Sequence, residues 1–353
     1  MRAYTHTRPG PASSVLLQST QPIPKLNLPT QTLIRISHCA LNPGASILMH
    51  LLPFSFRASP AIPELDFSGT IIEVGPSVPV ARALVPGTKV FGSIPVGRHV
   101  SRRCGALAQY VLVEHTAVAG APDTDMISPS GLAGLGVAGA TALVLLSAAT
   151  VEDGDKVLVN GAGGGIGHLV LQMCCERVGA GGRVVAIASG RHEVWLSGVE
   201  QRCRFIRHDG RDLVANLKEE VKNERFDVVV DAAGIQALFH ASPEFLKDDG
   251  VYVSVGPRAR SYTYLGMLGT IGSMASNILW PRSLGGTPRR YVQVAAASSL
   301  DSLEALANLV KEKTLKVHVG LCVGWDEVSN AYEQLLGRHA GGKIVVEIPD
   351  EEE

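Results

Sequence analysis

Apolar residues in the second half of the chain come in short runs that are separated by glycine, proline and charged residues. Residues 156–160 and 183–188 are two such runs, rich in β-branched side chains, and we predict both as buried strands. Strands are also predicted at 204–207, 226–231, 251–255 and 291–296, with a helix over 212–221. This alternation of strands and helices is typical of an open parallel sheet with crossover connections.

The first part of the chain shows a different pattern, in which short apolar runs are punctuated by proline and glycine. The strands predicted there are 15–17, 32–36, 69–74, 89–91 and 108–113. A charge-free segment, 131–149, predicts a pair of buried helices. The chain then ends with a helix at 303–310, a strand at 317–323, a helix at 325–336 and a strand at 341–348.

The closing strand has no partner helix, so we assign it to the N-terminal β-rich domain. The sequence thus predicts an α/β protein with two domains. Residues 1–122 and 298–353 form the β-rich domain, and residues 123–297 form the domain with the parallel sheet.

A glycine-rich turn follows the strand at 156–160, and a helical pattern follows the turn. Glycines at 161, 164 and 167 give the spacing G-x-x-G-x-x-G, with further glycines at 163 and 165. Such a turn lets the backbone approach a pyrophosphate, which the N-terminus of the following helix then binds. A flexible glycine loop in another kind of α/β protein is the alternative. The strand before the turn and the helix after it favour a dinucleotide site.

Composition narrows the class of protein further. The chain has 353 residues, 46% hydrophobic and 18% charged, with a net charge of −1 and no basic block, so nucleic acid is not an expected partner. Its six cysteines are scattered, which indicates reduced thiols and an intracellular protein. No apolar run of transmembrane length and no secretory signal is evident, so we expect a cytoplasmic protein without a membrane partner.

Five short motifs occur in a fixed order along the chain: Asn42-Pro43, the stretch 63–75, the stretch 105–111, Gly139-Ala-Thr141-Ala, and Gly-Lys343-Ile-Val. In this order they resemble the zinc-free quinone oxidoreductase-like and enoyl reductase-like branch of the medium-chain dehydrogenase/reductase superfamily. The resemblance implies a Rossmann-type doubly wound sheet, a GroES-like β-rich domain, and a homodimer that pairs through the edge strand near 291–297.

The resemblance also bears on zinc. The metal-dependent branch of the superfamily uses a cysteine, a His-Glu pair and a distant cysteine as ligands. Here Asn42 stands in the region of the first cysteine, and Leu65 and Asp66 stand where His-Glu would be expected. We therefore predict no metal. His38 and Cys39 are adjacent on a predicted strand and would point to opposite faces, so we interpret them as core residues.

The choice of cofactor depends on the end of the second strand of the nucleotide-binding domain. An NAD site has an acidic residue there, which binds the ribose 2′-hydroxyl. This chain has Ser189 and Arg191, and its first acid is Glu193. A guanidinium suits a 2′-phosphate, which favours NADPH over the alternative of a surface loop with an incidental arginine. His192 and Arg211 are the next candidates for that contact.

The expected cofactor site combines the glycine turn with residues at strand ends and residues placed by the resemblance. Its members are Asn42, Thr141, Gly161, Gly163, Gly164, Gly165, Ile166, Gly167, Ser189, Arg191, Ala232, Ala233, Gly256 and Lys343.

The catalytic residues are less defined. The resemblance places Asn42 near the nicotinamide, where its amide could donate to a substrate carbonyl, although an asparagine before proline is also a common turn residue. Tyr110 and His50 are possible proton donors, and packed or rim positions are the alternative for both. Ala45 stands where family members often have an acid.

The sequence therefore predicts an NADPH-dependent, zinc-independent oxidoreductase. By the resemblance, its hydride would go to a small molecule with a carbonyl-conjugated C=C bond, or to a quinone. Two alternatives stay open: a trans-acting enoyl reductase that works with a polyketide synthase, and an NADPH-binding scaffold without catalysis.

Overall fold

A computed structural model of the protein describes residues 1–200, 202–208, 213–221, 224–295, 297–337 and 340–350. The chain divides into two compact units, Met1–Ala140 with Ala297–Glu353, and Thr141–Ala296. The expected boundary at 122/123 falls earlier in the chain than this division. Residues 123–140 join the β-rich unit because helix α4, Pro129–Ala133, packs against strands of its sheet.

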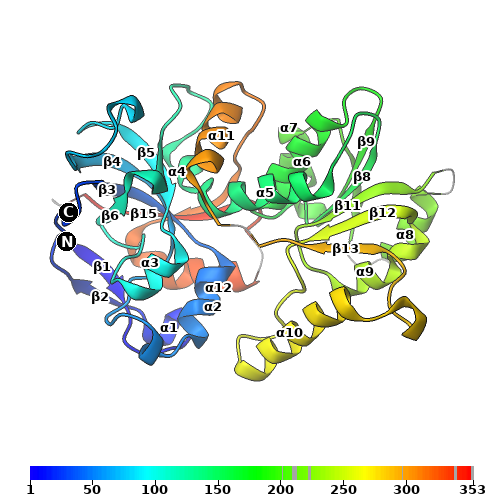
Figure 1. Cartoon of the computed structure of the whole chain (residues 1–353), viewed down its shortest axis with the longest axis horizontal. Helices are drawn as coiled ribbons and strands as arrows, with labels where there is room; N and C mark the ends of the chain where they lie inside the picture. The colour runs from blue at the N-terminus through cyan, green and yellow to red at the C-terminus, as the bar shows by residue number, and fades with distance from the viewer. Residues whose placement is uncertain (201, 209–212, 222–223, 296, 338–339, 351–353) are drawn as a thin grey trace. The chain divides into compact units, whose positions relative to one another are not determined.

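The main sheet of the first unit has the strand order β14-β15-β3-β4-β5-β7, and β6 also pairs with β3 (Figure 1). The closing strand β15 lies antiparallel to β3, with Val345 opposite Ala40, so its assignment to the N-terminal domain is confirmed. A separate hairpin-like pair joins β1 and β2. The strands are β1 Arg2–Thr5, β2 Leu17–Thr20, β3 Gln31–Ala40, β4 Asp66–Val74, β5 Lys89–Ser93, β6 Tyr110–Glu114, β7 Val118–Gly120, β14 Val319–Val323 and β15 Lys343–Glu347.

The helices of this unit are α1 Ala12–Val15, α2 Pro43–Leu51, α3 Val96–Ser101, α4, α11 Leu300–Lys311 and α12 Val328–Gly337. The sequence pattern missed α2, which begins directly after Asn42 with Pro43 in its first turn, where proline's fixed φ suits a helix. It also expected a strand at 15–17, where α1 ends at Val15 and β2 begins at Leu17.

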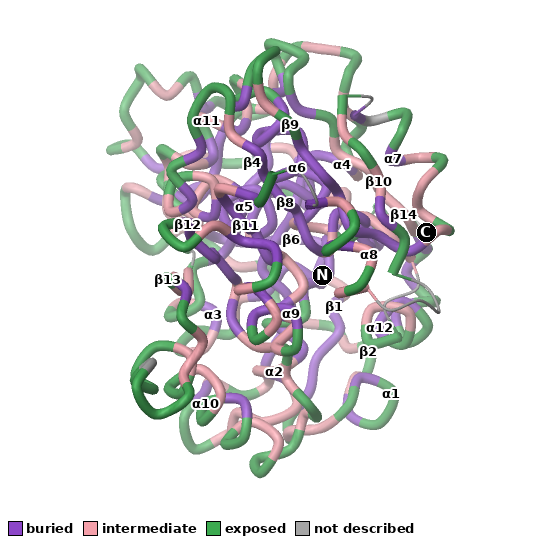
Figure 2. The backbone as a smooth tube through the Cα atoms, turned by 90° about the vertical axis from the view of Figure 1, so that its right-hand side faces the viewer, coloured by how far each residue is buried: buried purple, intermediate pink, exposed green. Residues whose placement is uncertain are grey.

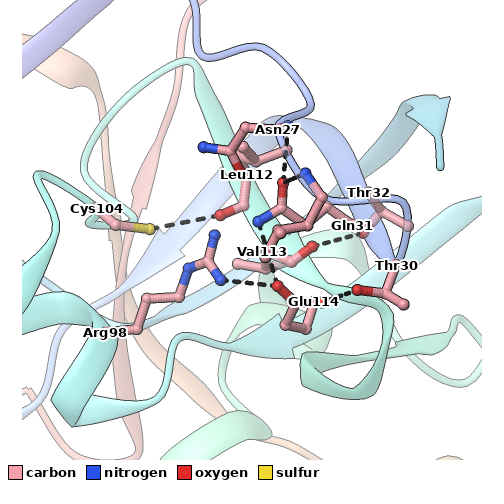
Figure 3. Close-up of polar contacts among 10 residues, drawn as sticks. Asn27, Thr30, Gln31, Thr32, Arg98, Cys104, Leu112, Val113 and Glu114 are labelled. Atoms are coloured by element: carbon pink, nitrogen blue, oxygen red, sulfur yellow. Dashed lines mark hydrogen bonds and ion pairs between the residues drawn. The ribbon is translucent and has the colours of Figure 1, made fainter.

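A polar network fixes the edge of this unit around Glu114 (Figure 3). The Glu114 carboxylate accepts from Thr30 Oγ1 at 2.6 Å, Gln31 Nε2 at 3.2 Å and Arg98 Nη1 at 3.0 Å. Partial burial raises the pKa of Glu114, but these three donors outweigh it, and the pKa lies below its ordinary value. The network therefore joins β6 to α3 and to the start of β3.

The second unit is built on a parallel sheet of order β10-β9-β8-β11-β12-β13. This order is that of a Rossmann-type sheet, with the first strand, β8, beside the point where the order reverses. The strands are β8 Lys156–Asn160, β9 Arg183–Ala188, β10 Arg204–Arg207, β11 Phe226–Asp231, β12 Leu246–Ser254 and β13 Arg290–Gln293. The strands predicted for this domain are confirmed; of the range 291–296, residue 296 lies outside the described residues.

The helices of this unit are α6 Gly167–Arg177, α7 Glu193–Val199, α8 Leu213–Glu220, α9 Gln236–Ala241 and α10 Tyr264–Leu279, and α5 Gly136–Ala149 runs across the division. Central strands of the sheet are buried, whereas α10 is largely exposed (Figure 2). The sequence pattern missed α10 because Gly266, Gly269 and Gly272 lower its helix propensity. Within the described residues, no helix is long and apolar enough to span a membrane.

Candidate active site

The glycine turn between β8 and α6 has the geometry of a phosphate-binding loop. Gly161 has a φ of +76°, and the N–H groups of Gly161 and Ala162 both donate to Ile187 O, at 3.1 and 3.0 Å. A Cβ at Gly167 would lie 2.0 Å from Gly161 O. The turn therefore requires glycine at 161 for its conformation and at 167 for close packing of the helix against the strand.

The middle of the turn is open. A Cβ at Gly164 would meet only Gly161 O, at 3.3 Å, so the packing of the protein itself barely requires glycine there. Gly165 and Ile166 complete the turn just before α6 begins at Gly167. At Gly163 a Cβ would lie 2.2 Å from His192 Nδ1, which brings the loop after β9 against the glycine turn. This arrangement leaves space beside Gly164 for a ligand.

The loop after β9 presents a hydroxyl and a guanidinium. Arg191 Nε donates to Ser189 Oγ at 3.2 Å, and Ser189 is buried. Glu193, the first carboxylate after the strand, accepts from Arg207 Nε at 2.7 Å. The carboxylate that could bind a ribose hydroxyl is thus paired with an arginine of β10, while the loop itself carries a cation.

Asp231, at the end of β11, was not among the predicted cofactor-binding residues, although it begins the run Asp231-Ala-Ala-Gly234 at a strand end. Its buried carboxylate accepts from the N–H groups of Ala233, Gly234 and Ile235 at 2.9–3.0 Å, and also from Asn160 Nδ2 and Tyr252 Oη. The signal in the sequence was an acid at the end of an apolar strand, followed by Ala-Ala-Gly. Asp231 therefore shapes the turn that contains Ala232 and Ala233.

This turn packs against its neighbours at the same edge of the sheet. A Cβ at Gly161 would lie 2.8 Å from the Ala233 Cβ, and one at Gly234 would lie 2.2 Å from Gly256 O. Gly256 has a φ of +92°. Ala233, Gly256 and the glycine turn are therefore brought together at the carboxyl ends of β8, β11 and β12, where open α/β sheets bind ligands.

In the β-rich unit, Asn42 and Lys343 are brought together. Lys343 Nζ donates to Asn42 Oδ1 at 2.9 Å, and Asn42 Nδ2 donates to Asp66 Oδ2 at 2.9 Å and to Ala40 O at 3.3 Å. Lys343 Nζ also lies 3.9 Å from Asp66 Oδ2. Burial lowers the pKa of Lys343 and raises that of Asp66, while their mutual attraction opposes both shifts.

Asp66 also fixes the start of helix α5. Its two carboxylate oxygens accept from Val137 N at 2.9 and 3.0 Å, near the N-terminus of the helix. The negative charge is favourable there because the free N–H groups of a helix start are partly positive. Lys343 and Asp66 thus hold Asn42 by its carbonyl and its amide respectively.

Glu64 is a second buried carboxyl in this cluster. Its oxygens accept from Asn42 N at 3.0 Å and from Tyr332 Oη at 2.7 Å, and its side chain is fully buried. Burial raises the pKa of Glu64 to about 8, against the opposing effect of the bonds from Tyr332 and Asn42. Glu64 is therefore largely protonated at neutral pH.

The other predicted catalytic residues lie in different surroundings. Tyr110 packs with Leu33 and Leu112 in a small apolar cluster, and His50 Nδ1 is bonded to Ser46 O of its own helix at 2.7 Å. Thr141 is buried on α5. Both amide hydrogens of Asn42 are engaged, so donation to a substrate would require exchange of its longer bond, to Ala40. The catalytic roles of Asn42, Tyr110 and His50 stay predictions.

Metal ligands are not grouped in the part of the chain that the structure describes: no set of three or more His, Cys, Asp or Glu side chains could hold an ion. At the position of the expected zinc ligands, Asp66 faces the ammonium group of Lys343. Cys39 is fully buried, and burial raises the pKa of its thiol; His38 is half-buried and bonded to Ser37 Oγ.

Comparisons with known proteins agree with this architecture. Residues 28–123 match the alcohol dehydrogenase GroES-like domain, and residues 203–346 match the zinc-binding dehydrogenase model. The medium chain reductase pydE of an Acremonium species is 28% identical, over 99% of each chain. The trans-enoyl reductase poxH of Penicillium oxalicum is 26% identical, over 99% of this chain and 98% of that protein.

Among solved structures, the quinone oxidoreductase from Coxiella burnetii superposes with a TM-score of 0.76 at 26% identity, over 99% of both chains. The chain belongs to the medium-chain dehydrogenase/reductase superfamily. It is an oxidoreductase of that type, with a Rossmann-type domain and a GroES-like domain, and its site is suited to a nicotinamide cofactor.

The open space at Gly164 leads to a first prediction. Gly164→Val should weaken binding of the nicotinamide cofactor at least about tenfold, because the added side chain occupies the place of the pyrophosphate, while the protein stays folded. Calorimetric titration with NADPH measures this. Gly181→Val is the matched control, since a Cβ there has its nearest contact at 3.8 Å, and it should bind normally. Unchanged affinity in Gly164→Val would show that the glycine run is only a loop.

The raised pKa of Glu64 leads to a second prediction. In the unfolded chain this carboxyl ionises near 4.5, whereas in the folded protein it keeps its proton up to about pH 8, so its contribution to stability is lost as pH rises between these values. Since one unit of pKa shift corresponds to about 1.4 kcal/mol, the loss should reach a few kcal/mol.

Urea unfolding of wild type and Glu64→Gln between pH 5 and pH 8 measures this loss of stability. The free energy of unfolding should fall with pH less steeply in Glu64→Gln, because glutamine does not ionise. Glu114→Gln is the control: the pKa of Glu114 is lowered, so its contribution is constant over this range. Equal slopes in wild type and Glu64→Gln would contradict the assignment.

Proposed function

We propose that this protein is an NADPH-dependent, zinc-independent reductase that delivers hydride to an activated C=C bond of an enone or enoyl compound, or to a quinone. The cofactor choice rests on the loop after β9. There Arg191 Nε donates to Ser189 Oγ at 3.2 Å, and Glu193 is paired with Arg207. A guanidinium at this position, with the first carboxylate after the strand engaged by Arg207, favours a cofactor that carries a 2′-phosphate.

When bound, NADPH would supply the hydride. The residues of this chain have separate tasks in the proposal. The turn between β8 and α6 binds the pyrophosphate beside the open space at Gly164, and Arg191 with Ser189 binds the 2′-phosphate. Ala232, Ala233 and Gly256 line the edge of the sheet that Asp231 holds in shape.

Charge that develops on the substrate oxygen must also be stabilised. Two groups could donate to this oxygen, the Asn42 amide and a backbone N–H. Because Asp66 and Ala40 already accept from both amide hydrogens of Asn42, we favour the backbone N–H as the donor and assign Asn42 to the cofactor side of the site. The proton comes from water or from a side chain not yet assigned, with Tyr110 and His50 as candidates.

The similarity to proteins named medium chain reductase and trans-enoyl reductase supports a second candidate within the same chemistry. In it, the protein reduces an enoyl group in trans for a polyketide synthase, so the substrate arrives on a carrier protein.

For assembly we propose a homodimer that pairs through β13, the edge strand of the parallel sheet, since an uncovered edge strand tends to pair.

The substrate class is tested by NADPH oxidation with a panel of quinones, small enones, and enoyl thioesters of coenzyme A and of a carrier protein. Turnover of quinones or free enones supports the first candidate, and turnover restricted to carrier-bound thioesters supports the second.

Activity should survive strong chelators, and metal analysis should find no stoichiometric zinc. About one zinc per chain, lost together with activity, would overturn zinc independence.

The cofactor choice is tested at Arg191. A charge-assisted bond to a phosphate is worth roughly 1.5–3 kcal/mol, so Arg191→Ala should weaken NADPH binding by roughly 10- to 150-fold. NADH lacks the 2′-phosphate, so its dissociation constant should hardly change. The two dissociation constants are measured in wild type, in Arg191→Ala, and in Arg177→Ala, which removes a charge from the exposed end of α6.

A parallel loss of both affinities in Arg191→Ala would make Arg191 structural. If neither affinity changes, another residue contacts the phosphate: His192 is the next candidate, and Arg211 lies outside the described residues. A wild-type preference for NADH would overturn the cofactor choice itself.

A further inference from the structure

Arg57, in the β-rich unit, is a buried arginine without a carboxylate partner among the described residues. Its side chain is only 7% exposed, and burial lowers the pKa of its guanidinium with no opposing acid in that part of the chain. Arginine nevertheless keeps its proton at neutral pH. Because a buried charge without a counter-charge is costly, this guanidinium requires an anionic partner that the described residues do not supply.

The contacts of Arg57 leave one edge of the guanidinium unpaired. The Phe54 ring covers one face, with Arg57 Cζ 5.3 Å from the ring centroid, and Nη1 donates to Leu48 O at 3.5 Å. Nε and Nη2 are buried and have no acceptor among the described residues. These two nitrogens share an edge of the planar group, and their N–H groups match the two oxygens of a carboxylate. The unpaired edge therefore has the geometry of a bidentate anion site.

Two buried histidines lie in the same cluster. The His6 ring meets the Phe54 ring edge-on, with the centroids 5.2 Å apart. His99 lies on α3, and the carbonyl of the next residue on that helix accepts from the N–H of the residue after Arg57 at 2.9 Å. The end of β1, the segment after α2 and helix α3 therefore meet around this guanidinium.

The cluster carries a single positive charge at neutral pH. The pKa values of His6 and His99 are both lowered to about 4, mainly by burial and in part by the positive charge of Arg57, so both rings are neutral. No aspartate or glutamate among the described residues contributes to either shift. One buried cation is neutralised by one negative charge, which a carboxylate supplies, whereas a phosphate monoester brings nearly two.

From this geometry we infer that Arg57 anchors a binding site for the carboxylate group of a small organic acid. Nε and Nη2 hold the two carboxylate oxygens, and the Phe54 ring covers the guanidinium. Ser55 and Phe56, just before Arg57, are exposed, so local movement of a surface segment gives a ligand access. The inference does not rest on the reaction proposed above, because none of these residues was assigned to the cofactor or to catalysis.

Sodium acetate is the probe, and acetamide, which has a similar shape without the charge, is its neutral control. The melting temperature of the full-length protein is measured at neutral pH, with acetate replacing chloride at constant ionic strength. Saturating acetate should raise it by roughly 2 °C or more, because a ligand that binds only the folded state stabilises that state. Acetamide should leave it unchanged. Saturation-transfer NMR of acetate measures the binding directly.

Arg57→Met is the decisive variant, because methionine fills similar space without the charge. Acetate binding should be lost, and the melting temperature without acetate should stay the same or rise, since the unpaired buried charge is gone. Arg57→Lys keeps a charge but not the two-pronged edge, so it should bind acetate at least about tenfold more weakly. Arg103→Met is the matched control: Arg103 is exposed just after α3, and its loss should leave acetate binding intact.

Four results would overturn the inference. The first is no stabilisation by acetate, or equal stabilisation by acetate and acetamide. The second is an unchanged acetate effect in Arg57→Met, which would place the binding elsewhere in the protein. The third is a strong fall in the melting temperature of Arg57→Met without acetate, which would show that the guanidinium already has a stabilising partner. The fourth is greater stabilisation by inorganic phosphate than by acetate, which would assign the site to phosphate.

Discussion

The β-rich unit depends on one buried ammonium group. Lys343, from the last strand of the chain, donates to Asn42 Oδ1 and to Leu41 O and lies beside the carboxylate of Asp66. Removing the ammonium group would leave Asp66 buried without a counter-charge, and removing Asp66 would leave the ammonium group buried without one. Either change should lower the free energy of unfolding by several kcal/mol. The closing strand therefore supplies the cation that the buried polar groups around Asn42 require.

In the parallel-sheet unit, a single buried carboxylate has the corresponding role of holding the loops in place. Asp231 ends β11 and accepts five hydrogen bonds, from three successive backbone N–H groups and from Asn160 and Tyr252. It fixes the turn after β11 against the glycine turn after β8. In both units, then, buried polar groups with all their partners present hold the loops on which the site is built.

Whether the sequence could predict a part of the site depends on how far apart along the chain the interacting residues lie. The glycine turn at 161–167 was predictable, since strand, glycines and helix are neighbours in the chain and each has a local pattern. Ser189 and Arg191 were placed at the end of β9 for the same reason, and their mutual bond is between residues two apart. Helix α10 was missed, because its glycines lower the local helix propensity, and contacts from other parts of its unit, such as the hydrogen bond between Asn277 and Gln236, help to hold it.

The sequence by itself determined the parallel sheet, the glycine turn, and the missing acid after β9, since all of these are set by local periodicity and residue type. Tertiary structure alone decided that Asn42 is held by Lys343, 301 positions away, and that Glu64, which accepts from Tyr332, 268 positions away, has a pKa raised by burial. The reason is physical: the pKa and the hydrogen-bond partners of a side chain depend on the water excluded around it and on the groups brought to it from distant strands, and neither has a signature in the adjacent residues.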